Sequence, residues 1–280
     1  MTSTARQLTR LAALAVLGCA AVYVVALGTG WGLRVDARAF PGWSDGDNWH
    51  RAHVAAARAV NTIHVATIAV AMVAATLVAL RRGRRDLMVV AVATLAGANL
   101  TTTILKQLLG HADPLGGDSA RFLHSTFPSG HATAAMSLAL VAVIVSPRRW
   151  RAWVALVAAA YAATVGVALV LRYAHYASDV VGGYLVAAAW AAAMAAVALR
   201  HREQPAPTPP LPIPSRRTLA TGGALVVAAA GLALVPASRL AHGIFAVSAV
   251  AIAALALLLP VGLTLLLARG DRSPRAHQPF

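Results

Sequence analysis

The feature that most constrains this chain of 280 residues is a series of long apolar stretches. A membrane-spanning α-helix needs about 20 predominantly apolar residues. The stretches are continuous and rich in Ala and Leu, so they predict helices, because the strands of a membrane barrel alternate in polarity. We therefore predict an all-α fold, a polytopic transmembrane helix bundle. Its eight expected spans are 11–29, 60–80, 87–108, 131–146, 152–171, 178–199, 218–236 and 243–268.

The composition supports this interpretation. Hydrophobic residues make up 59% of the chain and charged residues 12%, whereas a soluble domain carries about 25% charged residues. This excludes a disordered chain and an ordinary water-soluble enzyme. Cys19 is the single cysteine, so the chain can form neither an internal disulfide nor a thiolate metal site. Arg6 and Arg10 before the first stretch also fit a signal peptide, but the stretch is long and lacks a small-residue cleavage site, which favours an uncleaved anchor.

The charge distribution predicts an orientation. The chain has 24 Lys and Arg against 9 Asp and Glu, and the basic residues cluster between apolar stretches, which favours an anionic membrane surface and not nucleic acid as the partner. Most of them fall in alternate connections, so the positive-inside rule predicts a multi-pass plasma-membrane protein with both termini cytoplasmic. The outward-facing segments are then 30–59, 109–130, 172–177 and 237–242.

The sequence also predicts a division into units. Residues 1–202 form a six-helix core, and the Pro-rich segment 203–216 forms a stiff cytoplasmic linker. Residues 217–268 form two extra C-terminal transmembrane helices, a hairpin that offers a contact for a homo-oligomer, and residues 269–280 form a cytoplasmic tail. The segment 30–59 mixes tryptophans with charges, as expected of a loop lying on the outer surface.

Lys106 stands out because it is the only lysine among 23 arginines. At the end of the third span, it indicates a role for a compact ammonium group. Alternatively, it is a single lysine that extends to the membrane interface.

The segment Pro128-Ser129-Gly130-His131 opens the fourth span. A Pro-Ser-Gly turn at a helix N-terminus leaves backbone N–H groups free to bind an anion. Ser129 can cap the helix or donate to a phosphate oxygen, Gly130 permits close approach, and His131 lies in the first turn. Taken alone, the motif also fits simple capping.

Before the sixth span, His175 and Asp179 are four residues apart, with Arg172 three residues earlier. If the helix starts at or before His175, the two share one face, and the carboxylate can accept the Nδ1–H bond, leaving Nε2 as a nucleophile. Arg172 is placed to bind a phosphate bidentately. An Asp at a helix start can also be a purely structural charge partner.

The three groups all fall on the predicted outer side, and together they offer a nucleophile with its orienting carboxylate, an acid/base histidine, an anion site and two cations. These are the requirements of phosphoryl transfer without a metal or other cofactor.

Here the sequence resembles the integral-membrane type-2 phosphatidic acid phosphatases, whose motifs run Lys-x6-Arg-Pro, Pro-Ser-Gly-His and Ser-Arg-x5-His-x3-Asp. The second motif is complete, and the ends of the other two match at Lys106, Pro114, His175 and Asp179. The resemblance covers roughly residues 60–200.

Two motif arginines are absent from register. Asp113 stands in place of one, and Ala168 and Leu169 occupy the Ser-Arg positions of the third motif. Arg172 and Arg121 are the candidate replacements, with His111 as a third donor to the phosphate.

The resemblance implies a lipid phosphatase that hydrolyses a phosphomonoester or diphosphate of a polyprenyl or glycerolipid at the outer leaflet. In it, His175 forms a phosphohistidine, Asp179 orients its ring, and His131 acts as acid and base. Lys106, Ser129, Gly130 and Arg172 then bind the phosphate. Two alternatives remain: a phosphotransferase that passes the group to a sugar or lipid hydroxyl, and a catalytically weak lipid-phosphate binding or transport protein.

Overall fold

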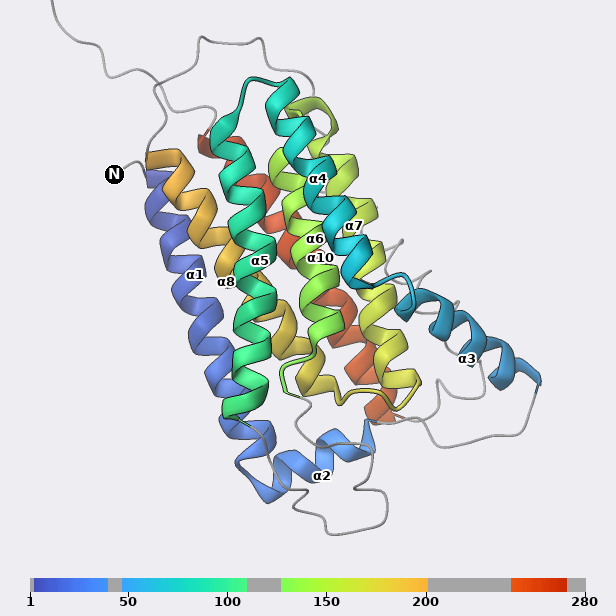
Figure 1. The fold of residues 1–280 in the computed structure, drawn as a ribbon. Helices are drawn as coiled ribbons and strands as arrows, with labels where there is room; N and C mark the ends of the chain where they lie inside the picture. The colour runs from blue at the N-terminus through green and yellow to red at the C-terminus, as the bar shows by residue number, and fades with distance from the viewer. Residues whose placement is uncertain (1–2, 40–46, 110–126, 201–242, 271–280) are drawn as a thin grey trace, which may run out of the picture.

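The structure is a computed structural model, and it describes residues 3–39, 47–109, 127–200 and 243–270. Within these ranges the regular structure is entirely helical, which confirms the all-α prediction (Figure 1). The helices are α1 (Ser3–Val22), a π-helical continuation η1 (Tyr23–Leu27), α2 (Gly30–Arg38), α3 (Asp47–Val60), α4 (Val65–Arg81), α5 (Arg85–Leu108), α6 (Gly130–Val145), α7 (Arg148–Leu171), α8 (Ala177–Arg200) and α10 (Gly243–Gly270).

Several of these helices can cross a membrane. Among the described residues, five are long and apolar enough to span it: Ser3–Leu27, Arg85–Leu108, Arg148–Leu171, Ala177–Arg200 and Ile244–Ala268. The helices α3 and α4 together pass the same test, but they bend by 52° at the break between them. The apolar helices thus indicate a multi-pass membrane protein. The expected span 218–236 lies outside the described residues.

Helix α6 is the centre of the bundle, although its 16 residues make it shorter than its neighbours. It packs against α5, α7 and α8 (Figure 1), and most of its side chains are buried. Many of them are alanines, and small residues let membrane helices approach closely. Buried polar contacts add to this packing: the hydroxyls of Thr102 on α5 and Thr133 on α6 are 2.9 Å apart.

The outer helices complete the bundle in pairs. Helix α1 runs along α8, and α10 runs along α7. On α10, Phe245, Ile252 and Leu263 are almost fully buried and belong to the same hydrophobic core as α6 and α7. The described part of the C-terminal region therefore shares its core with the helices before it, while the boundaries of the proposed units remain predictions.

The segment 30–59 is not the surface loop that its composition suggested, because its described residues form α2 and α3. Thr29 caps α2, its hydroxyl accepting a hydrogen bond of 3.0 Å from the Gly32 N–H. On α3, apolar residues recur at helical spacing and form one buried face of the helix. This face packs against α7. The face consists of Trp49, Ala52, Ala56 and Val60. This spacing indicates a helix, whereas the tryptophans and charges alone had suggested a loop.

The two ends of the bundle differ in character. The described arginine clusters lie at one end, at the start of α1, between α4 and α5, between α6 and α7, and at the end of α8. Contacts across this end include the guanidinium of Arg200, which donates to the Thr9 hydroxyl at 3.1 Å. The C-terminus of α5, the N-terminus of α6 and the α7–α8 connection lie at the opposite end (Figure 1).

Candidate active site

The first part of the site is the N-terminus of α6, which begins at Gly130. The Ser129 hydroxyl accepts a hydrogen bond of 3.3 Å from the Ala132 N–H, so this serine is the helix cap. The N–H groups of Gly130 and His131 belong to the first turn, where no intrahelical acceptor exists. They and the helix dipole therefore provide a place for an anion.

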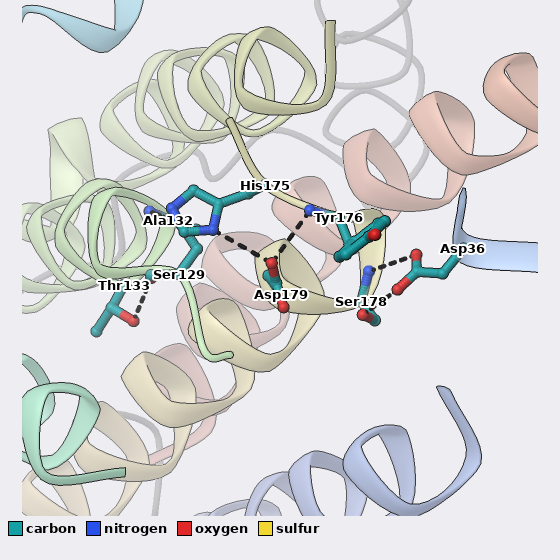
Figure 2. Close-up of polar contacts among 8 residues, drawn as sticks. All are labelled: Asp36, Ser129, Ala132, Thr133, His175, Tyr176, Ser178 and Asp179. Carbon is teal, nitrogen blue, oxygen red and sulfur yellow. Dashed lines mark hydrogen bonds and ion pairs between the residues drawn. The ribbon is translucent and has the colours of Figure 1, made fainter. Parts of the chain in front are cut away.

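The second part is the pair His175 and Asp179. Helix α8 begins at Ala177, after His175, so the two residues do not share a helical face as the spacing suggested. The imidazole Nδ1 nevertheless lies 3.2 Å from the Asp179 Oδ2 (Figure 2). The same carboxylate oxygen accepts the Tyr176 N–H at 3.1 Å. With the Nδ1–H directed at a carboxylate, Nε2 keeps its lone pair for attack on an electrophile.

These two parts lie against each other. The Ser129 N–H donates to the backbone carbonyl of Asp179 at 2.9 Å. A glycine allows this approach, because a Cβ on Gly183 would lie 2.7 Å from the Ser129 carbonyl oxygen and 2.9 Å from the Thr133 hydroxyl. The chain thus brings two of the sequence motifs, about 45 residues apart, into one place.

The third part is Lys106, in the last turn of α5. Thr102, one turn earlier on the same face, contacts Thr133 of α6 and so turns this face of α5 toward α6. The Lys106 Nζ lies 4.0 Å from the position that a Cβ on Gly130 would occupy. The only lysine of the chain therefore places its ammonium beside the N-terminus of α6.

His131 lies among the basic groups of the site. Its imidazole is within electrostatic range of His175, Lys106 and Arg172. His64, which precedes α4, also acts on it and was not identified from the sequence. No motif marks His64, because it comes close to His131 only through the packing of α4 beside α6.

The structure also shows where the departures from the family motifs fall. Ala168 and Leu169, which occupy the positions of the third motif's Ser-Arg, are fully buried inside α7. Arg172 lies at the C-terminal end of the same helix and is exposed. The other predicted phosphate-binding groups, Arg121 and His111, lie outside the described residues, as does Asp113.

A contact that the sequence did not predict links Asp36 of α2 to the start of α8. The Ser178 N–H donates to the Asp36 Oδ1 at 3.2 Å, and the Ser178 hydroxyl donates to Oδ2 (Figure 2). The pKa of Asp36 is raised to about 6, because the carboxyl is buried; the hydrogen bonds from Ser178 oppose this shift, and the charge of Asp179 adds to it. No local signal could reveal a contact across 142 positions.

Within the described ranges, no three His, Cys, Asp or Glu side chains lie close enough to hold a metal ion together. The site instead offers a paired imidazole, a second imidazole, an ammonium and a helix N-terminus. This set suits an anionic substrate whose charge shifts during reaction.

A comparison with known proteins gives a match over the four helices that carry the site, α5 to α8. The model of the PAP2 superfamily matches residues 87–203, which contain all of α5 except its first two residues, the whole of α6, α7 and α8, and all three groups of site residues. No curated protein and no solved structure gives a significant match. The match confirms the resemblance seen in the motifs, and it is consistent with a member of the type-2 phosphatidic acid phosphatase family.

Proposed function

We propose that this protein is a lipid phosphatase that hydrolyses a phosphomonoester or diphosphate of a membrane lipid through a phosphohistidine. The superfamily match supports phosphatase-type activity on phosphate esters in general. The apolar helices around the site favour a lipid as substrate, since its tail can remain in the bilayer while its phosphate reaches the ends of α5 to α8.

In the first step, the Nε2 of His175 attacks phosphorus, and the bond from phosphorus to the lipid oxygen breaks. His131 gives its proton to the departing oxygen. In the second step, a water molecule attacks the phosphorus of the phosphohistidine while His131 takes a proton from that water. The P–N bond breaks, and its electron pair returns to Nε2. Asp179 accepts the Nδ1–H bond throughout and stabilises the positive charge on the ring.

The phosphate oxygens would be held by groups from three helices. These are the ammonium of Lys106, the N–H groups of Gly130 and His131, and the guanidinium of Arg172. Such preorganised donors usually supply the largest share of catalysis in transfers of this kind. They would provide the positive charge that a metal ion provides in other phosphatases, so we expect the reaction to be insensitive to chelators.

The observation that carries the proposal is the hydrogen bond from Ser129 to the Asp179 carbonyl. It sets the turn at the start of α6, formed by Ser129, Gly130 and His131 and called the anion-binding turn below, beside the His175–Asp179 pair. The test is phosphate release by purified protein from polyprenyl and glycerolipid phosphates, with and without a chelator. His175→Ala should abolish release, whereas His50→Ala, at an exposed histidine of α3, should leave it unchanged. Equal turnover by His175→Ala and the wild type would refute the assignment.

The burial of Ala168 and Leu169 favours a second candidate function, lipid-phosphate binding or transport, since this helix then offers no motif arginine to the phosphate. In that case the protein binds the lipid phosphates, but they persist unhydrolysed, and His131→Ala leaves binding intact. A phosphotransferase differs from a phosphatase only in its acceptor. The ratio of transferred to released phosphate, measured with sugar and lipid hydroxyl acceptors, separates the two.

The arginine clusters at the end opposite the site support an orientation. We propose that they face the cytoplasm, so that the site faces the outer side of the plasma membrane.

A further inference from the structure

His175 does not lie on a helix. It belongs to the short connection between α7, which ends at Leu171, and α8, which begins at Ala177. The position of its ring therefore depends on how firmly both ends of this connection are fixed.

The α7 end is fixed by a helix-terminating motif. The Tyr173 N–H bonds to the Val170 carbonyl and the Ala174 N–H to the Leu169 carbonyl, both at 3.0 Å. This is the paired pattern that closes many helices with a left-handed residue, usually glycine. Here Tyr173 takes that conformation, with φ of 57°, and its ring stacks on His53 of α3 at 6.4 Å between centroids.

The α8 end is fixed by Asp36, which comes from a different helix. Its carboxylate accepts the N–H and the hydroxyl of Ser178, and a backbone hydrogen bond from Ala177 also favours the ionised form. Asp36 thus acts as the N-terminal cap of α8, a position where a carboxylate also meets the positive end of the helix dipole. Asp36 and Ser178 are each only 8% exposed.

This cap adjoins the reacting groups. Ser178 precedes Asp179, whose side chain holds the His175 ring and whose carbonyl accepts the Ser129 N–H. In Figure 2, Asp179 lies between the ring of His175 on one side and the Ser178–Asp36 contact on the other. A rotation of the first turn of α8 would therefore move the nucleophile relative to the anion-binding turn.

We propose that Asp36 is a positioning residue for the proposed reaction: by capping α8 through Ser178, it holds the His175–Asp179 pair in line for attack on phosphorus. The inference rests on the proposed function. Displacements of about 1 Å in a reacting group can cost a factor of 100 in rate. The groups that would bind the phosphate come from α5, from α6 and, with Arg172, from the end of α7, whereas Asp36 contacts the first turn of α8, so the effect falls on kcat and not on KM.

The test compares kcat and KM for phosphate release from a lipid phosphate by purified Asp36→Ala, Ser178→Ala and the double variant. Asp36→Ala should lower kcat at least about tenfold, with KM within about threefold of the wild type. Because both residues act through one contact, the double variant should be no slower than Asp36→Ala alone. Asp36→Asn keeps an acceptor for the Ser178 N–H and should stay within about threefold of the wild type.

Arg34→Ala, at an exposed position of the same helix, is the matched control and should leave kcat unchanged. A wild-type kcat in Asp36→Ala, independent effects in the double variant, or an Asp36→Asn as slow as Asp36→Ala would overturn the inference. If Asp36→Ala fails to fold, Asp36→Leu carries the test, because its side chain has a similar bulk but accepts no hydrogen bond from Ser178, and a wild-type kcat in it has the same meaning.

The two proposals fail separately. A wild type that releases no phosphate contradicts the proposed function. The role of Asp36 is then read from amide hydrogen exchange, where Asp36→Asn should protect the Tyr176 and Ser178 amides as the wild type does, while Asp36→Ala should expose both. Unchanged exchange in Asp36→Ala would overturn the positioning role.

Discussion

At the scale of single residues, two carboxylates meet at the start of α8 and have different partners there. Asp179 belongs to α8 itself, and Asp36 belongs to α2. Asp179 accepts bonds from His175 and Tyr176, whereas Asp36 accepts bonds from Ser178. The side chain of Asp179 is fully buried, and that of Asp36 nearly so. Burying a carboxylate is costly unless hydrogen bonds satisfy it, and these contacts offset part of that cost.

The raised pKa of Asp36 predicts a pH dependence of stability. Its pKa is about 6 in the folded protein against an ordinary value of 3.8. Between these values the folded state keeps a proton that the unfolded state has lost, so the free energy of unfolding falls as the pH rises through this window. Asp36→Asn cannot titrate and should lack this loss.

Thermal unfolding of the detergent-solubilised protein from about pH 4 to pH 8 checks this prediction. The unfolding temperatures of Asp36→Asn and the wild type should be close near pH 4, with the variant higher above pH 6. Parallel curves for the two proteins across the range would show that Asp36 does not titrate in this window.

At the scale of elements, the site depends on how closely α8 approaches α6. A Cβ on Gly183 would meet the backbone of Ser129 and of Thr133 at 3.0 Å or less. Backbone cannot move aside as a flexible side chain can. Gly183→Ala should therefore push α8 away from the anion-binding turn and lower kcat/KM for phosphate release at least about tenfold.

Gly262→Ala on α10 is the matched control, because a Cβ there would meet no atom within 4 Å. We expect it to keep wild-type activity and to be slightly more stable, since alanine is favoured over glycine inside a helix by about 0.5–1 kcal/mol. Wild-type kcat/KM in Gly183→Ala would show that the α6–α8 contact does not govern the site.

Helix positions were largely predictable from the sequence. In a membrane, a long continuous apolar stretch forms a helix, because a helix satisfies all its backbone hydrogen bonds within the segment. The predicted stretch 87–108 corresponds to α5 (Arg85–Leu108), and 178–199 to α8 (Ala177–Arg200). The sequence did not predict α2 and α3, where charges and tryptophans obscured the helical spacing of Ala52 and Ala56.

The site was predictable in part. The Pro-Ser-Gly-His turn and the His175–Asp179 pair are short-range patterns, so their residues could be named from the sequence alone. Asp36 and His64 reach the site only through the packing of α2 and α4, and no local pattern encodes such contacts. The sequence showed that Ala168 and Leu169 stand where the third motif has Ser and Arg, but it did not show that both residues are completely buried.

At the scale of the whole molecule, the separation of the arginine clusters from the site predicts a topology that chemical labelling can test. In a Cys19→Ser background, single cysteines would replace Arg34 on α2 and Arg85 at the start of α5, both exposed. In intact cells, a membrane-impermeant maleimide should label the first and not the second; after lysis it should label both. The opposite pattern would place the site on the cytoplasmic side.

In the mechanism that we propose, the ends of α5 to α8 form one site in which His175 takes up the phosphoryl group. The most direct test is to mix the purified protein with a radiolabelled lipid phosphate, stop the reaction within one turnover, and locate the protein-bound phosphate by peptide mapping. We expect an acid-labile, alkali-stable phosphate on His175, absent from His175→Ala. Phosphate release with no label on His175, or label on another residue, would contradict it.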